Sequence, residues 1–233
     1  MRSKEVDPHL VRFIAERRAT IAAIDLSCGT GNQLVTNAQA YPDLRLVGLD
    51  FSIGMLNQAR AKMAALPWIH GDTTDLPFRD AAFDYASNQF AFHHVIDKAQ
   101  MLREVFRLLR VGGRFVIQNI EPHSMQDAQL YRYFPTVLTA DLRDFAASKK
   151  IETMLRQAGF AEVAITVNKH HTEKRRSDLL NAWHRREDCS QLTAITDAEY
   201  AAGLAALERD IANAETDPVL DETSFLTIIA DKA

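Results

Sequence analysis

Cysteine is scarce in this chain, which holds only Cys28 and Cys189. Two isolated cysteines give no disulfide framework and no spacing typical of a metal site. No apolar stretch approaches the roughly 20 residues that a membrane-spanning helix needs, and residues 1–11 lack the apolar core of a secretory signal. We therefore expect a cytoplasmic protein with reduced thiols, without a bound metal and without a membrane partner.

Positive charge is also limited, because 27 lysine and arginine residues face 31 aspartate and glutamate residues, for a net charge of −4. A nucleic-acid-binding surface depends on clustered basic residues, so we expect no nucleic-acid partner. The apolar fraction of 47% and the charged fraction of 25% are ordinary for a globular protein. The length of 233 residues fits one domain that carries an insertion.

Short apolar runs alternate with segments of helical periodicity along most of the chain. The runs predict strands over residues 20–25, 44–50, 68–70, 83–88, 114–120, 161–168 and 224–230. The periodic segments predict helices over 8–18, 32–40 and 52–63, from Asp97 to a left-handed cap at Gly112-Gly113, and through 151–158. Such alternation is typical of an α/β fold: a doubly wound, Rossmann-like, mostly parallel sheet with helices on both faces.

The segment Asp25-Leu-Ser-Cys-Gly-Thr-Gly31 lies between the first predicted strand and the helix that begins at Asn32. Gly29 and Gly31 lack the Cβ atoms that would hold a ligand away from the backbone. Asp50 ends the second predicted strand 19 residues further on, and a carboxylate there can accept both hydroxyl hydrogens of a ribose. The pattern therefore favours a nucleotide-type cofactor. The third glycine of the dinucleotide motif is missing, which disfavours a nicotinamide or flavin.

Residues 170–218 interrupt the alternation, since they are too many for a simple connection between the last two strands. We expect a helical insertion there, with helices over 177–186 and from the capping signal Thr196-x-x-Glu199. A similar signal, Ser124-x-x-Asp127, predicts another helix start. The predicted organisation is one domain, made of an N-terminal helix (1–19), a cofactor-binding core (20–169), the insertion (170–218), which is a candidate lid or dimer surface, and a final strand (219–233).

Four segments in the same order resemble the motifs of the class I S-adenosylmethionine-dependent methyltransferases, above all the type 11 group that includes ubiquinone and menaquinone biosynthesis enzymes. They are residues 24–31, 47–56, 71–84 and 104–113. The resemblance covers about residues 20 to 120 and implies a seven-stranded sheet with an antiparallel seventh strand. It departs at Ser27, where many members have glycine, and at Val111, where proline is usual.

The resemblance implies S-adenosylmethionine as the cofactor and gives roles to the strand ends. Asp25 would face the ammonium of the ligand, Asp50 would hold the ribose hydroxyls, and Asp72 would accept a hydrogen bond from the adenine amino group. An Asx turn is the alternative for Asp72. Carboxylates suit a ligand that is cationic at sulfur and carries an ammonium. The other cofactor residues that the resemblance implies are Ser27, Gly29, Gly31, Phe51, Thr73 and Asn88.

His93 and His94 follow the fourth predicted strand, and either could act as a general base toward the methyl acceptor. For each histidine taken alone, capping or bracing the next helix is the favoured interpretation. Tyr131, Tyr133 and Trp183 are candidates for the acceptor side of the site. Their alternative role is to pack as core.

Together these features predict an enzyme, a methyltransferase that moves a methyl group from S-adenosylmethionine to a small organic acceptor by in-line displacement. The acceptor atom, oxygen, nitrogen or carbon, stays open. One alternative is an NAD(P)-dependent oxidoreductase, which the lack of any Tyr-x-x-x-Lys pair disfavours. Another is a non-catalytic protein that binds S-adenosylmethionine and acts through partners. The amphipathic segment 197–213 is a candidate homodimer surface.

Overall fold

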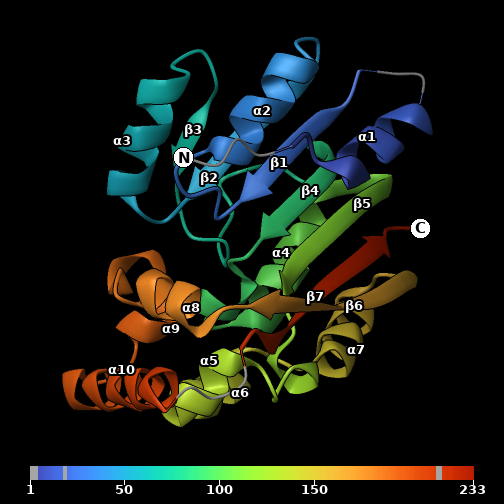
Figure 1. Cartoon of the computed structure of the whole chain (residues 1–233). Coiled ribbons are helices and arrows are strands. Elements are labelled where there is room, and N and C mark those ends of the chain that lie inside the picture. Colours follow the sequence, from blue (N-terminus) through green and yellow to red (C-terminus); the bar gives the residue numbers. More distant parts are fainter. Residues whose placement is uncertain (1–4, 18–19, 214–216) are drawn as a thin grey trace. The chain divides into compact units, whose positions relative to one another are not determined.

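The computed structural model describes residues 5–17, 20–213 and 217–233 (Figure 1). The chain contacts divide it into two compact units, and each is described by itself. Unit 1 comprises Met1–Asn119, Ser148–Thr166 and Leu226–Ala233. Unit 2 comprises Ile120–Ala147 and Val167–Phe225. The predicted single domain with an insertion over 170–218 stays a prediction.

Seven strands form one sheet in the order β3-β2-β1-β4-β5-β7-β6 (Figure 1). Their bounds are β1 Ala22–Leu26, β2 Arg45–Asp50, β3 Trp68–His70, β4 Phe83–Gln89, β5 Leu109–Ile120, β6 Glu162–Lys174 and β7 Val219–Asp231. The pairs β1/β2, β1/β4, β2/β3 and β4/β5 are all parallel. The predicted mostly parallel α/β sheet is thus confirmed. Its strand order reverses between β1 and β4, which is where such sheets bind ligands.

The seventh strand runs antiparallel to β5, as predicted. The Gly112 N–H donates to the Lys232 carbonyl (2.6 Å), whereas the Glu121 N–H donates to the Ser224 carbonyl (2.9 Å). The residue number of the partner in β7 falls as the residue number along β5 rises, which defines an antiparallel ladder. Both β6 and β7 are longer than the sequence pattern predicted. The additional residues of β6 are polar, and in β7 the polar Asp221-Glu222-Thr223 separates Val219-Leu220 from the predicted apolar run.

The helices of unit 1 cover both faces of its part of the sheet (Figure 1). They are α1 Pro8–Ala15, α2 Asn32–Ala40, α3 Ile53–Lys62, α4 Lys98–Leu108 and α7 Ser148–Ala158. Helices α1, α2 and α3 share one apolar cluster with Trp68 and Tyr85. Helix α4 meets the segment just after α7 through the rings of Phe106 and Phe160, whose centroids are 5.2 Å apart. The buried residues of α1, α4 and α7 are apolar, as expected for amphipathic helices, whereas α2 also buries Gln33 and Asn37.

Helix α4 ends at Leu108, so the predicted cap at Gly112-Gly113 is wrong. Leu109 already belongs to β5 and is paired with Phe83 of β4. Gly112 keeps the predicted left-handed conformation (φ +74°), but it does so inside β5. The pairing of Leu109 with a strand 26 residues away overrides the local helix signal.

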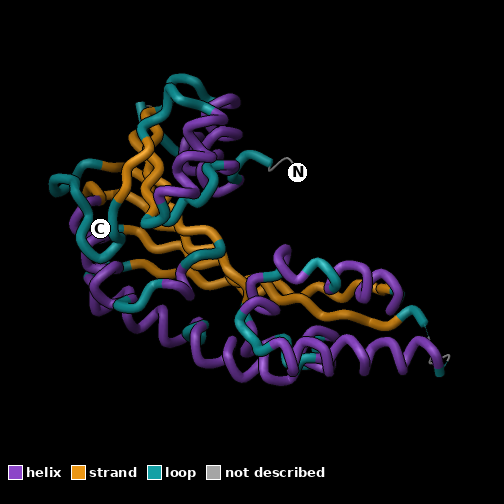
Figure 2. Tube along the Cα trace, turned by 90° about the vertical axis from the view of Figure 1, so that its left-hand side faces the viewer, coloured by secondary structure: helices purple, strands orange, loops and turns teal. Residues whose placement is uncertain are grey.

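Unit 2 is built from short helices around one apolar cluster (Figure 2, helices in purple). They are α5 Gln129–Tyr133, α6 Pro135–Asp144, α8 Arg176–Trp183, α9 Ser190–Thr193 and α10 Asp197–Ala212. Thr196 and Glu199 form the predicted capping box at the start of α10. The predicted helix start at Ser124 is wrong, since Ser124 ends a 3-10 turn and Asp221 accepts the Gln129 N–H (2.9 Å) where α5 begins.

Trp68 fills a space that two glycines leave open in unit 1. A Cβ atom on Gly31 would lie 2.4 Å from the Trp68 ring, and one on Gly48 would lie 2.6 Å from it. The indole N–H donates to the Met63 carbonyl (2.9 Å), which fixes the ring in place. Gly31 also has a left-handed backbone (φ +72°). Position 31 is therefore glycine because any larger residue would collide with the Trp68 ring.

Replacing Gly31 with alanine is expected to destabilise unit 1 by about 3 kcal/mol, because overpacking against Trp68 adds to left-handed strain. Gly29→Ala is the matched control. Gly29 has a similar φ (+55°), but nothing lies within 4 Å of the point that its Cβ would occupy, so we expect a cost of only about 1 kcal/mol. Equilibrium unfolding in urea measures both values. Equal losses would contradict the role given to Trp68.

Candidate functional site

A cavity of about 700 Å³ opens in unit 1 at the carboxyl ends of β1, β2, β3 and β4. Six of the nine predicted cofactor residues line it: Ser27, Gly29, Asp50, Phe51, Asp72 and Thr73. The other three, Asp25, Gly31 and Asn88, do not. The cavity lies where the order of the parallel strands reverses, as expected for a ligand site of this fold.

Asp50 joins two of the turns that form the cavity wall. Its Oδ2 accepts the Gly29 N–H (2.8 Å) and its Oδ1 accepts the Ser52 N–H (2.8 Å). The side chain is 9% exposed. A carboxylate has about four acceptor positions, so two backbone donors leave capacity for the hydroxyl groups of a ligand. The geometry can therefore hold a diol at the end of β2.

The turn after β1 presents bare backbone to this carboxylate. Ser27 and Gly29 both have left-handed φ values, +58° and +55°. No atom lies within 4 Å of the point where a Cβ on Gly29 would stand. The open space beside Gly29 is the cradle that a ligand needs to approach the main chain.

The loop after β3 contributes Asp72, Thr73 and Thr74 to the cavity. Asp72 makes the Asx turn that was one of its two interpretations, because its Oδ1 accepts the Thr74 N–H (2.8 Å). Asp72 is exposed and Thr73 is buried. Lining the cavity and forming the turn are thus both features of Asp72.

Asp25 and Asn88 lie behind the cavity wall. Asp25 is 4% exposed and accepts a hydrogen bond from the Ser87 hydroxyl (2.8 Å). Asn88 is fully buried, and its Nδ2 donates to the Leu26 carbonyl (2.9 Å). Its Oδ1 has no hydrogen-bond partner among the described residues. Both side chains tie the end of β1 to β4.

The charge that lines the cavity is negative. Among the described residues, the charged side chains in its wall are Asp50, Asp72 and Asp97, and no lysine or arginine lines it. A wall of carboxylates attracts cations and disfavours anions. No group of histidine, cysteine or acidic side chains that could hold a metal ion occurs in residues 5–17, 20–213 and 217–233. Within the same ranges, no helix is both long and apolar enough to cross a membrane.

Residues 24–117, which carry this cavity, match the family model of the methyltransferase domain. This part of the chain is similar to a methyltransferase domain. A demethylmenaquinone methyltransferase of Staphylococcus aureus is 34% identical over 144 residues, which are 59% of this chain and 60% of that relative. The alignment thus covers less than two thirds of the curated relative.

Solved structures share the fold at lower sequence identity. A candidate methyltransferase of an antibiotic biosynthesis pathway from Anabaena variabilis superposes with a TM-score of 0.70 and 22% identity, over 97% of this chain and 99% of that one. A phosphoethanolamine N-methyltransferase of Haemonchus contortus, solved with S-adenosylmethionine, gives a TM-score of 0.61 and 18% identity, over 96% of this chain and 51% of that one. These structures support the fold of the methyltransferase domain.

The two candidate base residues, His93 and His94, differ in position. His94 lines the cavity and His93 does not. The Nδ1 atom of His93 lies 3.3 Å from the Asn119 amide nitrogen, and the two imidazole centroids are 3.8 Å apart. The Lys98 ammonium donates to the carbonyls of His93 (3.2 Å) and Val95 (2.8 Å). His93 therefore braces the turn that presents His94.

Several lining residues were missed by sequence reasoning. They are Cys28, Ser52, Met55, Thr74, Gln89, Ala91, Val95, Ile96 and Asp97. Five of these nine adjoin a predicted site residue along the chain, so proximity to the motifs was the signal that could have found them. Phe90 has a left-handed backbone (φ +54°), which is uncommon for an aromatic residue. No sequence pattern shows that conformation.

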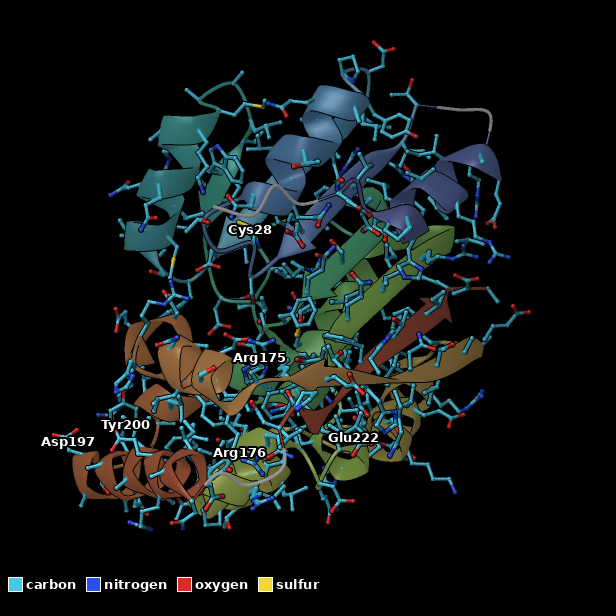
Figure 3. The ribbon with its side chains drawn as sticks, viewed as in Figure 1. Cys28, Arg175, Arg176, Asp197, Tyr200 and Glu222 are labelled. Carbon is cyan, nitrogen blue, oxygen red and sulfur yellow. The ribbon has the colours of Figure 1, made fainter. Side chains whose placement is uncertain are left out.

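Cys28 stands inside the glycine turn of the methyltransferase domain (Figure 3). Burial raises the pKa of its thiol far above the ordinary value, and the carboxylates of Asp25 and Asp50 raise this pKa further. A thiol with so high a pKa stays protonated at neutral pH. Cys28 is therefore not an activated nucleophile.

The three predicted acceptor-side aromatics lie in the apolar cluster of unit 2. The Tyr131 hydroxyl donates to Asp141 (2.7 Å), and the Tyr133 hydroxyl accepts from the Arg176 guanidinium (3.1 Å). Trp183 is 8% exposed. All three pack as core, which was their alternative interpretation, and burial raises the pKa of Tyr131. Their role toward an acceptor stays a prediction.

Alkylation should reveal the protonated state of Cys28. Because the folded-state pKa of its thiol is raised, we expect iodoacetamide to modify Cys28 at pH 8 at least about tenfold more slowly than a free cysteine. The rate should keep rising with pH beyond about pH 10, where an unperturbed thiol has levelled off. Peptide mass spectrometry measures the rate, with the urea-unfolded chain as control. Equal native and unfolded pH profiles would contradict this prediction.

Proposed function

We propose that this chain transfers a methyl group from S-adenosylmethionine to a small organic acceptor. The observation that carries the proposal is the Asp50 carboxylate beside the bare backbone of Gly29, in a methyltransferase domain. The acidic wall of the cavity supports it as well, because the cofactor carries a sulfonium and an ammonium. The complex of the Haemonchus contortus relative with S-adenosylmethionine supports the same cofactor.

The residues of unit 1 fit both the adenosine half and the methionine half of this cofactor. The Asp50 carboxylate would accept the ribose hydroxyls, while Asp72 and the Thr73 amide would meet the adenine ring. The open backbone at Ser27 and Gly29 would receive the methionine half. Asp25 would add negative charge beneath that backbone, and the exposed Phe51 would complete the wall. Gly31 and the buried Asn88 would support the wall from behind.

S-adenosylmethionine supplies a methyl group on a positively charged sulfur, so the leaving group is already activated. The chain then needs no nucleophile of its own, which agrees with the protonated thiol of Cys28. Its residues bind, orient and exclude water. Such positioning lowers a barrier by roughly 7–11 kcal/mol when the geometry is good.

Two rival functions are weaker. A nicotinamide-dependent oxidoreductase would share the Asp50 position, but it usually has a third glycine in the turn before α2. A non-catalytic binding protein would keep the cavity and show no turnover. Cytoplasmic location, the absence of a nucleic-acid partner and a homodimer through 197–213 stay predictions.

Calorimetry with S-adenosylhomocysteine and with NADH tests the cofactor. We expect micromolar binding of the first and none of the second. Asp50→Ala should weaken S-adenosylhomocysteine at least about 30-fold, because a buried site that loses its polar partner discriminates strongly. Asp43→Ala is the control, since Asp43 is exposed and lies outside the cavity wall. Binding of NADH alone, or unchanged affinity in Asp50→Ala, would refute the assignment.

We also propose that His94, rather than His93, acts as the base when the acceptor carries a proton. His94→Gln should lower kcat about 100-fold and leave the S-adenosylhomocysteine Kd within about threefold, because the change lies at the reacting end. His93→Gln is the matched control, since His93 does not line the cavity. Turnover on phenolic, amine and carbon-acid acceptors from pH 6 to 9 measures this. Wild-type kcat in His94→Gln would contradict the role.

A further inference from the structure

The connection between β3 and β4 lacks a helix. In the sheet order it passes from the edge strand β3 across β2 and β1 to β4, and residues 71–82 form only turns and bends. Parallel strands are usually joined by a helix, which satisfies its own backbone groups. An irregular segment must find partners for those groups elsewhere. We call residues 71–82 the crossover loop.

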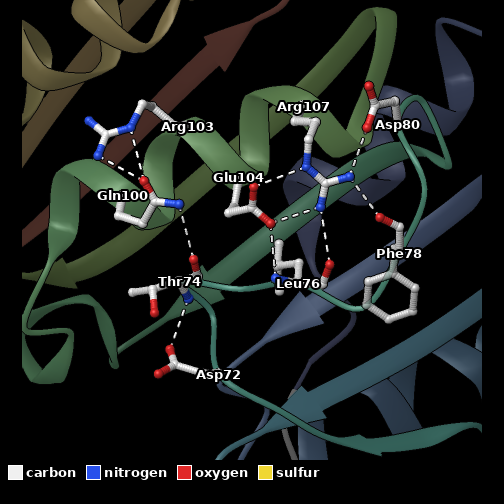
Figure 4. A network of polar contacts seen from close by, with 9 residues as sticks. All are labelled: Asp72, Thr74, Leu76, Phe78, Asp80, Gln100, Arg103, Glu104 and Arg107. Atoms are coloured by element: carbon white, nitrogen blue, oxygen red, sulfur yellow. Dashed lines mark hydrogen bonds and ion pairs between the residues drawn. The ribbon is translucent and has the colours of Figure 1, made fainter.

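Helix α4 supplies these partners from one face. Gln100, Glu104 and Arg107 are spaced by four and three residues, so they share a side of the helix (Figure 4). Three residues of the opposite side are buried in the core: Met101, Leu102 and Val105. The packing of α4 on the sheet therefore fixes where its polar face stands.

The first two contacts hold the half of the loop that lines the cavity. The Gln100 amide donates to the Thr74 carbonyl (3.2 Å), and Glu104 accepts the Leu76 N–H at its Oε2 (2.9 Å). Thr74 in turn donates its N–H to the Asp72 carboxylate (2.8 Å; Figure 4). Asp72 is therefore two hydrogen bonds away from α4.

Arg107 holds the rest of the loop. Its guanidinium donates to the carbonyls of Leu76 (3.0 Å) and Phe78 (2.7 Å) and to the Asp80 carboxylate (2.8 Å). It also forms a two-point ion pair with Glu104, at 3.0 and 2.7 Å. This pair lowers the pKa of Glu104. A planar guanidinium is needed for so many directed bonds.

None of the three α4 side chains lines the cavity. We propose that Gln100, Glu104 and Arg107 are positioning residues that set the purine selectivity of the cofactor site by holding Asp72 and Thr73. The proposal rests on the proposed function. The three residues decide which purine is accepted, although none of them touches it. A role in stability alone would not have this effect.

The physical reason is the fixed direction of the Asp72 carboxylate. A carboxylate accepts a hydrogen bond from the 6-amino group of adenine, whereas the 6-oxo group of hypoxanthine presents an acceptor and is repelled. To discriminate adenine from hypoxanthine, the hydrogen-bonding groups of the site must be held rigidly. A loop released from α4 can turn Asp72 away, so it loses both the attraction and the repulsion.

The test compares S-adenosylhomocysteine with S-inosylhomocysteine by calorimetry on the full chain. In the wild type we expect the adenine ligand to bind at least about 30-fold more tightly. Arg107→Met should reduce this ratio at least about fivefold, because the directed bonds to the loop are lost. Gln100→Ala, which removes one hydrogen bond to the crossover loop, should reduce the ratio less.

Arg114→Met is the matched control. Arg114 forms an equivalent two-point ion pair in the same unit, but its partner is Asp231 of β7 (2.7 and 2.8 Å) rather than the crossover loop. We expect this variant to lower the melting temperature and keep the wild-type ratio. If Arg107→Met does not fold, Gln100→Ala decides, since it removes only one hydrogen bond to the crossover loop, besides two exposed ones to Arg103.

The outcomes separate the two proposals. A wild-type chain that binds neither nucleoside overturns the proposed function and the positioning role together. A wild type that prefers adenine, with a ratio unchanged in Arg107→Met and in Gln100→Ala, overturns the positioning role alone. Equal loss of the ratio in Arg114→Met would also overturn it, because general destabilisation would then explain the effect.

Discussion

The hydrogen bonds of one carboxylate organise the candidate site. Asp50 accepts the N–H of Gly29 from the turn after β1 and the N–H of Ser52 at the start of α3. Both turns follow strands that are paired in register, with Leu26 beside Leu49. Because the two strands are aligned, the Asp50 side chain can bond to both turns, and these bonds fix the cavity wall. It also stands near the N-terminus of α3, where the helix dipole favours negative charge.

The other walls are held by the same principle, a polar side chain that satisfies the backbone of an irregular segment. Gln100, Glu104 and Arg107 hold the loop after β3, and the Lys98 ammonium holds the turn after β4 through two carbonyls. All four residues lie on α4. One helix, packed on the sheet by its apolar side, thus positions two of the four segments that surround the cavity.

The local features of the fold could be predicted from the sequence, and the features set by distant partners could not. Ser52, the first residue of the helix expected over 52–63, caps α3, and Thr196 caps α10 as expected, because a cap is decided within one helical turn. The predicted end of α4 was wrong, since pairing with Phe83 draws Leu109 into a strand. Six of nine predicted cofactor residues line the cavity, but the reason for Gly31 is a tryptophan 37 positions along the chain.

The chain has only two tryptophans, and each unit contains one of them. Trp68 is packed against glycines in unit 1, whereas Trp183 lies edge-on to Phe134 in unit 2, with ring centroids 5.3 Å apart. Each unit therefore carries one source of intrinsic tryptophan fluorescence. A Trp→Phe exchange at either position leaves a single tryptophan, and its emission spectrum reports on the unit that retains it.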